Sequence, residues 1–454
     1  MRTPHVVVIP YPAQGHVIPM MEISQCLVMK GFKVTFVNTE FNHNRVMKAL
    51  KEEDKIKGKI NLVSMPDGLE PWQDRNELGQ LSLAIFSTMP RKLEELIMKI
   101  NESDRDKVTC VLADGSMGWA IEVAAKMGIK RVAFWPASAA HLACGFCIPK
   151  LMEDGIINEN GTPVKGEMIQ LSPTMPPINP ANFVWPCIGD LNTQRIVFEV
   201  MVKNNNAAKL VDWLICNTSY DFEPAALSLA PEILPIGPLL ASNRLGNPSG
   251  YFWPENSTCL KWLDQQPPSS VIYVAFGSFT VFDSIQFQEL ALGLELSNRP
   301  FLWVARNDIT NGSNDPYPEG FLDRVANHGQ IVGWAPQQSV LLHPSIGCFL
   351  SHCGWNSTME GVSNGVPILC WPYFADQFLN QSYVCDVWKV GLGFNRDKKG
   401  VVSKEEIVQK VNQVFGDEEM KARVLKLKEK AMKDVKEGGC SFKNFNNFIE
   451  YMKV

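Results

Sequence analysis

The stretch SHCGWNST, from Ser351 to Thr358, gathers side chains that could hold a negatively charged ligand. It follows the apolar run IGCFL, so we expect a strand that ends at His352 and a helix that begins near Ser357. The free N–H groups at the start of a helix attract anions. Because His352, Asn356 and Ser357 could add side-chain donors, the stretch predicts a phosphate-binding site.

The same stretch also fits an ordinary capped helix. Ser357 and Glu360 are three residues apart, as in a capping box. In that arrangement Glu360 closes the helix start and does not accept from the hydroxyls of a ligand. Trp334 and Trp355 lie near strand ends, where a tryptophan usually belongs to the core. From this segment alone, capping and core packing are the more common outcomes, and both interpretations stay open.

His16 and Asp114 could carry out proton transfer. Each follows an apolar strand and precedes a helix, and ligands of parallel sheets bind beyond the carboxyl ends of the strands. The positive end of a helix disfavours an imidazolium, so we expect His16 to be mostly neutral at pH 7 and able to accept a proton. A carboxylate at its other nitrogen would orient the ring. The alternative is that both side chains only cap their helices, and position alone favours neither interpretation.

The elements that must position these residues alternate along the chain. Apolar runs such as HVVVIP, KVTFVN and VTCVLA are separated by amphipathic helical segments, and the alternation restarts with VIYVAF and PFLWVA. Continuous apolar strands between helices are typical of a buried parallel sheet. A chain of 454 residues is also too long for one ordinary core. We therefore expect two doubly wound α/β domains, 1–240 and 257–436, joined by a Pro- and Gly-rich linker at 241–256.

The composition excludes several classes of function. A net charge of −5 gives no reason to expect nucleic acid or an anionic membrane as a partner. No apolar stretch is long enough for a transmembrane segment, and the N-terminus does not resemble a signal peptide. Twelve cysteines without paired spacing are then expected to be reduced thiols in a cytoplasmic protein. Without metal-ligand spacing or a G-x-G-x-x-G motif after a strand, we expect no metal and no nicotinamide or flavin cofactor.

The segment from Trp334 to Gln377 resembles the signature box of plant family 1 UDP-sugar glycosyltransferases, complete and without a gap. PYPAQGHVIPM, CLKWLDQQPPSSVIYVAFGS and YPEGFLDRV are similar to other segments of that family and occur in the same order. The resemblance covers nearly the whole chain. It implies the GT-B fold, two Rossmann-like domains facing a cleft, with the UDP-sugar in the C-terminal domain and the acceptor mainly in the N-terminal one. It also implies that a final helix at about 437–454 crosses back to the first domain.

The resemblance implies a role for each matching residue. Trp334 would stack on the uracil, and Glu360 would accept from the ribose hydroxyls. Gln377 at the end of the box usually accompanies glucose as the donor sugar. The residues implied to bind the UDP-sugar are Ser278, Trp334, Ala335, Gln337, His352, Gly354, Trp355, Asn356, Ser357, Glu360, Asp376 and Gln377.

The implied reaction is an inverting, metal-independent transfer of glucose from UDP-glucose, which serves as a substrate. His16 would be the general base, with Asp114 as its partner, and the product would be a β-glucoside. Tyr373 and parts of three stretches, 65–89, 137–152 and 183–200, would line the acceptor pocket. These stretches are rich in Met, Phe, Trp and Pro, so a small phenol, flavonoid or terpenoid alcohol is expected. We expect a monomer. The alternative function is a binding protein that keeps the fold without catalysis.

Overall fold

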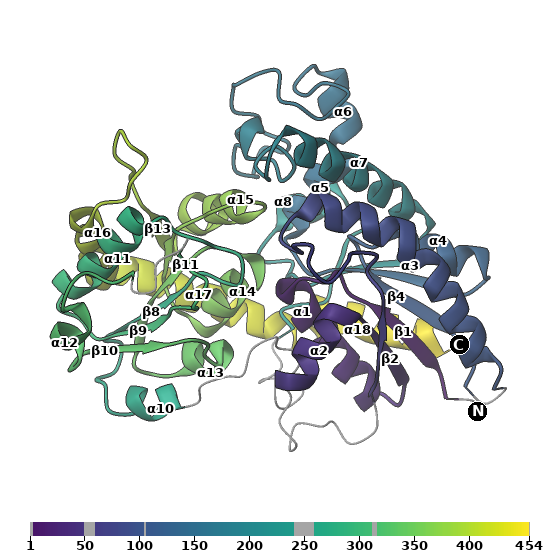
Figure 1. Cartoon of the computed structure of the whole chain (residues 1–454), viewed down its shortest axis with the longest axis horizontal. Helices are drawn as coiled ribbons and strands as arrows, with labels where there is room; N and C mark the ends of the chain where they lie inside the picture. The colour runs from purple at the N-terminus through teal and green to yellow at the C-terminus, as the bar shows by residue number, and fades with distance from the viewer. Residues whose placement is uncertain (1–2, 50–59, 104–105, 240–257, 311–315, 454) are drawn as a thin grey trace. The chain divides into compact units, whose positions relative to one another are not determined.

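The computed structural model describes residues 3–49, 60–103, 106–239, 258–310 and 316–453. The chain divides into two compact units, which are described separately (Figure 1). The first unit comprises Met1–Pro254, Phe374–Asp376 and Lys433–Val454, and the second comprises Glu255–Tyr373 and Gln377–Met432. The predicted linker at 241–256 lies outside the described residues.

The first unit is built on a seven-stranded parallel sheet with the strand order β3-β2-β1-β4-β5-β6-β7. Its strands are β1 His5–Ile9, β2 Lys33–Thr39, β3 Ile60–Met65, β4 Cys110–Asp114, β5 Lys130–Trp135, β6 Trp213–Cys216 and β7 Leu234–Pro235. Every residue of β1 and β4 is buried, because helices cover both faces of the sheet. The apolar runs HVVVIP, KVTFVN and VTCVLA therefore predicted β1, β2 and β4 correctly.

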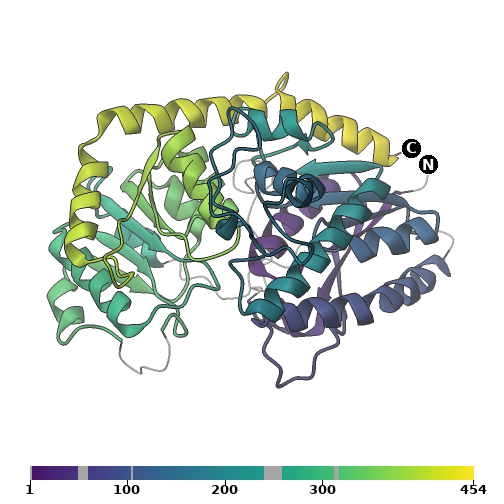
Figure 2. The same ribbon diagram turned by 90° about the horizontal axis from the view of Figure 1, so that it is seen from above.

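Helices of the first unit follow most of its strands. They are α1 Gln14–Met29, α2 Glu40–Ala49, α3 Leu78–Asn101, α4 Gly118–Lys126, α5 Ala139–Phe146, α6 Ile148–Glu153, α7 Leu191–Ala207, α8 Pro224–Leu229 and α18 Cys440–Lys453. Helix α18 buries Phe445, Phe448 and Ile449 in one core with β1 and β2. Figures 1 and 2 show α18, in yellow, against the first unit. The last helix of the chain thus packs in the same apolar core as the first strand.

The second unit contains a six-stranded parallel sheet with the strand order β10-β9-β8-β11-β12-β13. Its strands are β8 Val271–Ala275, β9 Phe301–Val304, β10 Gly329–Val332, β11 Ile346–Ser351, β12 Ile368–Cys370 and β13 Gly391–Gly393. Its helices are α10 Thr258–Leu263, α11 Ser284–Leu296, α12 Phe321–Val325, α13 Gln337–Leu342, α14 Trp355–Asn364, α15 Gln377–Ser382, α16 Lys404–Gly416 and α17 Glu418–Asp434. Apolar cores lie on both faces of this sheet as well. The predicted pair of doubly wound α/β sheets is confirmed.

Each sheet reverses its strand order next to its first strand. In the first unit β1 lies between β2 and β4, and in the second unit β8 lies between β9 and β11. Ligands of open α/β sheets bind at such switch points, beyond the carboxyl ends of the strands. His16 follows β1 and Asp114 ends β4, whereas His352 follows β11. The fold therefore places three predicted site residues at the two switch points.

No helix in the described part of the chain is both long enough and apolar enough to cross a membrane. All twelve cysteines are free thiols, and most of them are buried.

Candidate functional site

The predicted base and its partner meet in the first unit. His16 lies in the first turn of α1, and its Nδ1 is 2.7 Å from Oδ2 of Asp114 at the end of β4. The other carboxylate oxygen, Oδ1, accepts from the Ser116 N–H at 2.8 Å. The Asp114 side chain is completely buried, whereas that of His16 is 27% exposed. This geometry fixes the tautomer with the proton on Nδ1 and leaves Nε2 to accept a proton.

Neither residue serves as a helix cap. The N-cap of α1 is Ala13, and the N-cap of α4 is Met117. The alternative in which His16 and Asp114 only cap their helices is therefore wrong.

The protonation of His16 differs from the sequence-based expectation. Burial is the largest single effect and lowers the pKa of His16, but the charge and the hydrogen bond of Asp114, together with the charge of Asp376, raise the pKa above its usual value. Asp376, which groups with the first unit, acts in the same direction. We expected the helix start to lower this pKa, and the direction is the opposite because neighbouring carboxylates raise it. The pairing makes His16 a stronger base.

The loop after β11 leads into a helix whose N-cap residue has no side chain. Helix α14 begins at Trp355 with Gly354 as its N-cap, and no side chain of the described residues caps it. The helix thus begins two residues before Ser357, near the predicted start, but the predicted capping box of Ser357 with Glu360 is wrong, since both residues lie inside the helix. A helix start of this kind, without a capping side chain, is compatible with an anion site.

His352 stands beside this helix start in a cradle of two glycines. A β-carbon placed on Gly277 or on Gly354 would lie 2.6 or 2.5 Å from His352 Nε2, so only glycine fits at either position. Burial, together with the charge of Arg306, lowers the pKa of His352 to about 4. The ring is therefore neutral near pH 7 and can donate one hydrogen bond. Ser278 follows Gly277 directly in the turn after β8.

Gln337, Ser357 and Glu360 form one polar cluster between α13 and α14. The Gln337 Nε2 group donates to Ser357 Oγ at 2.9 Å and to Glu360 Oε2 at 2.7 Å. Gln338 donates to Glu360 Oε1 at 3.2 Å. Burial raises the pKa of Glu360 to about 7, although the two amide donors oppose the shift. The structure thus orients this carboxylate with side chains from α13.

Four other predicted donor-site residues are buried or half-buried in the second unit. Trp334 is half-buried and packs on the core of the second unit, and Ala335 beside it is buried. Asn356 is half-buried in the first turn of α14. Trp355 is buried with its ring 6.3 Å from that of Trp388, as the core interpretation predicted.

The end of the signature box folds back on itself. Gln377 begins α15, and its side-chain oxygen accepts from the backbone N–H of Tyr373 at 2.7 Å. Tyr373 itself is exposed, and Asp376 between them is half-buried. Gln377 therefore helps to fix the loop that precedes it.

Sequence reasoning missed Glu223, a buried carboxylate in the first unit. It accepts from the N–H groups of Ala139 at 2.9 Å and Ala140 at 2.8 Å, and from Thr218 Oγ1 at 2.6 Å. Burial raises the pKa of Glu223 to about 7. It thereby closes the start of α5, which carries part of the predicted acceptor stretch. Glu223 is more than 80 residues from Ala140 in the sequence, so local pattern gave no signal.

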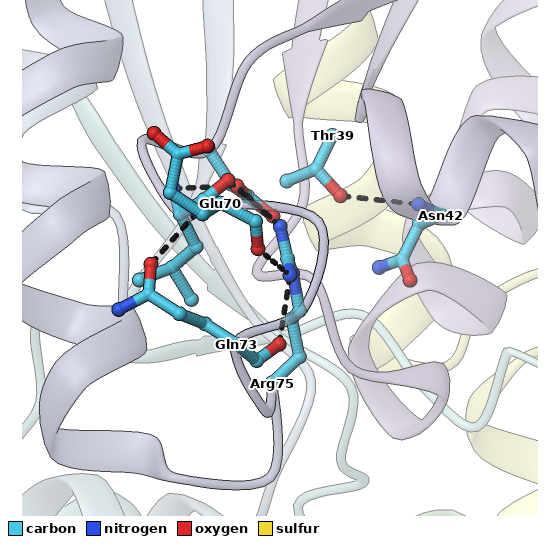
Figure 3. A network of polar contacts seen from close by, with 7 residues as sticks. Thr39, Asn42, Glu70, Gln73 and Arg75 are labelled. Carbon is cyan, nitrogen blue, oxygen red and sulfur yellow. Dashed lines mark hydrogen bonds and ion pairs between the residues drawn. The ribbon is translucent and has the colours of Figure 1, made fainter.

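Arg75 is a second missed residue, and it fixes the loop between β3 and α3. Its Nη1 donates to the carbonyl oxygens of Glu70 at 2.6 Å and Gln73 at 2.8 Å, and its Nε and Nη2 each lie 3.2 Å from the Asp67 carboxylate. Figure 3 shows Arg75 beside Glu70 and Gln73 in this network. The predicted acceptor stretch at 65–89 thus begins with an ordered loop.

The described ranges contain no group of three or more His, Cys, Asp and Glu side chains that could hold a metal ion.

Comparison with known proteins identifies the family. The family model for UDP-glucoronosyl and UDP-glucosyl transferase matches residues 255–434. UDP-glycosyltransferase 83A1 of Arabidopsis thaliana is 49% identical over 463 residues, which cover 100% of this chain and 97% of that protein. Linamarin synthase 1 of Manihot esculenta is 34% identical, with coverage of 99% and 97%.

Solved structures of other proteins are similar to this chain over almost its whole length. A UDP-glucosyltransferase from Polygonum tinctorium, in complex with 3,4-dichloroaniline, has a TM-score of 0.85 at 27% identity over 100% of both chains. UGT2 of Phytolacca americana, complexed with UDP-2fluoro-glucose and pterostilbene, has a TM-score of 0.81 at 28% identity over 99% of both chains. The signature box, the two parallel sheets and relatives of full length all agree, and the chain therefore belongs to the plant family 1 UDP-glycosyltransferases, with their GT-B fold.

Proposed function

We propose that this UDP-glycosyltransferase transfers glucose from UDP-glucose to a hydroxyl of a small apolar acceptor, with inversion at the anomeric carbon. The observation that carries the proposal is the hydrogen bond of 2.7 Å between His16 and the buried Asp114. A binding protein without catalysis has no need of a histidine that is held in one tautomer and made more basic by a buried carboxylate. The arrangement supports catalysis over binding alone.

The proposed reaction is a single displacement. His16 Nε2 takes the proton of the acceptor hydroxyl while its oxygen forms a bond to the anomeric carbon. The bond from that carbon to the diphosphate breaks, and UDP leaves with the electron pair. Attack on the face opposite the leaving group converts the α-linked donor into a β-glucoside. Asp114 stabilises the imidazolium that forms on His16.

The second unit would hold the donor. The start of α14, which has no capping side chain, and the neutral His352 would donate to the diphosphate, whose negative charge grows as the bond breaks. Glu360, oriented by Gln337 and Gln338, would accept from the ribose hydroxyls. Glucose is supported by Gln377 and by relatives named glucosyltransferases, such as the 7-deoxyloganetin glucosyltransferase of Catharanthus roseus.

The acceptor class rests on the named relatives. The Polygonum tinctorium enzyme is described as capable of glucosylating indoxyl, and the Phytolacca americana complex contains pterostilbene. Other relatives are named for linamarin and 7-deoxyloganetin. These are small molecules with phenolic, terpenoid or alcoholic hydroxyls, so we propose an acceptor of this kind. Release of UDP from UDP-glucose on mixing with a panel of such acceptors tests the function, and a lack of release with every member would contradict it.

We expect glucosyl transfer to survive an excess of EDTA. The helix start of α14 and the side-chain donors around it would stabilise the leaving diphosphate without a cation. The measurement is the rate of UDP release before and after chelation, with added Mg²⁺ as the control. Loss of activity that Mg²⁺ restores would contradict this account of the anion site.

Affinity for UDP-glucose is expected to rise with pH around the pKa of Glu360. Because the pKa of Glu360 is raised to about 7, the carboxyl is protonated below that pH and becomes the better acceptor above it. The Glu360→Gln variant should bind UDP-glucose about 10-fold more weakly or worse and should lose the pH dependence. Calorimetric titration between about pH 6 and about pH 8 measures both effects.

Glu295→Gln serves as the control for that titration, because Glu295 is paired with Arg324 on the surface of α11. Equal pH dependence in the Glu360→Gln variant and in the wild type would show that Glu360 does not contact the ribose.

A further inference from the structure

Arg306 carries a permanent positive charge into the interior of the second unit. It follows β9, and its side chain is only 4% exposed. The guanidinium donates to the carbonyl oxygens of Gly277 and, at 2.9 Å, of Thr280, and its Nε donates to Asp308 Oδ1 at 2.9 Å. Burying a charge is costly unless it is well bonded, and a guanidinium cannot lose its proton to reduce the cost. A buried guanidinium that is bonded in this way therefore indicates a specific role for Arg306.

The two carbonyl groups that Arg306 binds bracket Ser278. Gly277 and Thr280 belong to the turn after β8, at its two ends, with Ser278 and Phe279 between them. A planar, rigid group that bonds both ends fixes the shape of the turn. Gly277 has a φ of +67°, which only glycine adopts readily, so the turn already has one specific shape. Arg306 therefore determines where Ser278 lies.

The charge of Arg306 also affects the pKa of His352. After burial, Arg306 is the next cause of the lowered pKa of His352. His352 is thus neutral, while Arg306 stays charged in the same part of the molecule. The carboxylate of Asp308 is 70% exposed, so water screens much of its opposing charge. A fixed charge that is buried and weakly screened also changes the energy of charged groups to which it is not hydrogen-bonded.

We propose that Arg306 is a positioning residue for glucosyl transfer, which holds the Ser278 turn against the diphosphate and supplies a fixed positive charge that favours departing UDP. The inference rests on the proposed function, in which the second unit holds UDP-glucose. When the bond between the anomeric carbon and the diphosphate oxygen breaks, the electron pair stays with that oxygen. A charge that is already in place stabilises this oxygen without reorganisation.

The test compares binding of UDP and of uridine to the full chain by calorimetry. Arg306→Met is expected to weaken UDP binding by about 10-fold or more, while uridine binding changes by no more than about 3-fold. Arg306→Lys should give intermediate UDP affinity, because lysine restores the charge but cannot hold both carbonyl groups of the turn. A purely structural role would weaken the two ligands in parallel, and that result would overturn the proposal.

Two control variants sharpen the comparison. Arg324→Met removes an arginine of the same unit that pairs with Glu295 at the surface, and it should leave both affinities unchanged. Asp308→Asn should not weaken UDP binding, because it removes an opposing charge.

If Arg306→Met does not fold, the Arg306→Lys variant provides the test. The proposal would be overturned if this lysine variant bound both UDP and uridine as tightly as the wild type does. Failure of the wild type to bind UDP at all would instead overturn the proposed function, and this inference with it.

Discussion

The His16→Ala variant is expected to lose glucosyl transfer while it keeps nearly full affinity for UDP. The base and the donor site belong to different units, so removal of the imidazole should leave the second unit unchanged. Loss of a general base costs about 10²- to 10⁴-fold in rate. Initial rates of UDP release with one acceptor, together with calorimetric titration of UDP, measure the two effects.

Two further observations make the His16 test decisive. Added imidazole should restore part of the activity of His16→Ala, because the missing group is then supplied from solution. UDP affinity serves as the check that the variant is folded. Wild-type turnover in His16→Ala would show that another group takes the proton from the acceptor.

The Asp114→Asn variant is expected to keep the fold and to lose about 10²-fold or more in rate. The asparagine oxygen can still accept from the Ser116 N–H, so its amide nitrogen would face His16 Nδ1. The amide donates a hydrogen bond at the place where the carboxylate accepts one, so His16 Nδ1 must become the acceptor. The proton of the ring then lies on Nε2, and Nε2 can no longer take the proton of the acceptor hydroxyl. Steady-state kinetics with one acceptor measure the loss.

The same variant should also shift the pH dependence. His16 must be deprotonated to act, so kcat/KM of the wild type rises as pH rises through the pKa of His16. Because the Asp114 carboxylate raises that pKa, its removal should move the inflection to lower pH. An unchanged rate and an unchanged profile would both contradict the role of Asp114.

Several strands, and the strand ends at which ligands bind, could be predicted from the sequence for one physical reason. A parallel strand that is covered on both faces must be apolar along its whole length, so β1, β4, β8 and β11 are visible as continuous apolar runs. The residues directly after such runs are then candidates for a site. His16, Asp114 and His352 were found in this way.

The remaining features depend on contacts between distant parts of the chain. The pattern of Ser357 and Glu360 suggested a capping box, but the chain turns into α14 already at Gly354, where close approach to His352 requires glycine. The direction of the His16 pKa shift was missed because the prediction considered only the helix start, whereas the charge and hydrogen bond of Asp114 raise the pKa. Arg306 has no local signature either, since it acts through carbonyl groups at the end of another strand.

The most direct test of the central claim is to incubate the protein with UDP-glucose and the acceptor that releases UDP fastest, and to determine the product by NMR. The account predicts a β-glucoside on an acceptor hydroxyl, one UDP for each glucoside, and no product from the His16→Ala variant. An α-glucoside, or equal product from the variant, would contradict an inverting transfer in which His16 is the base.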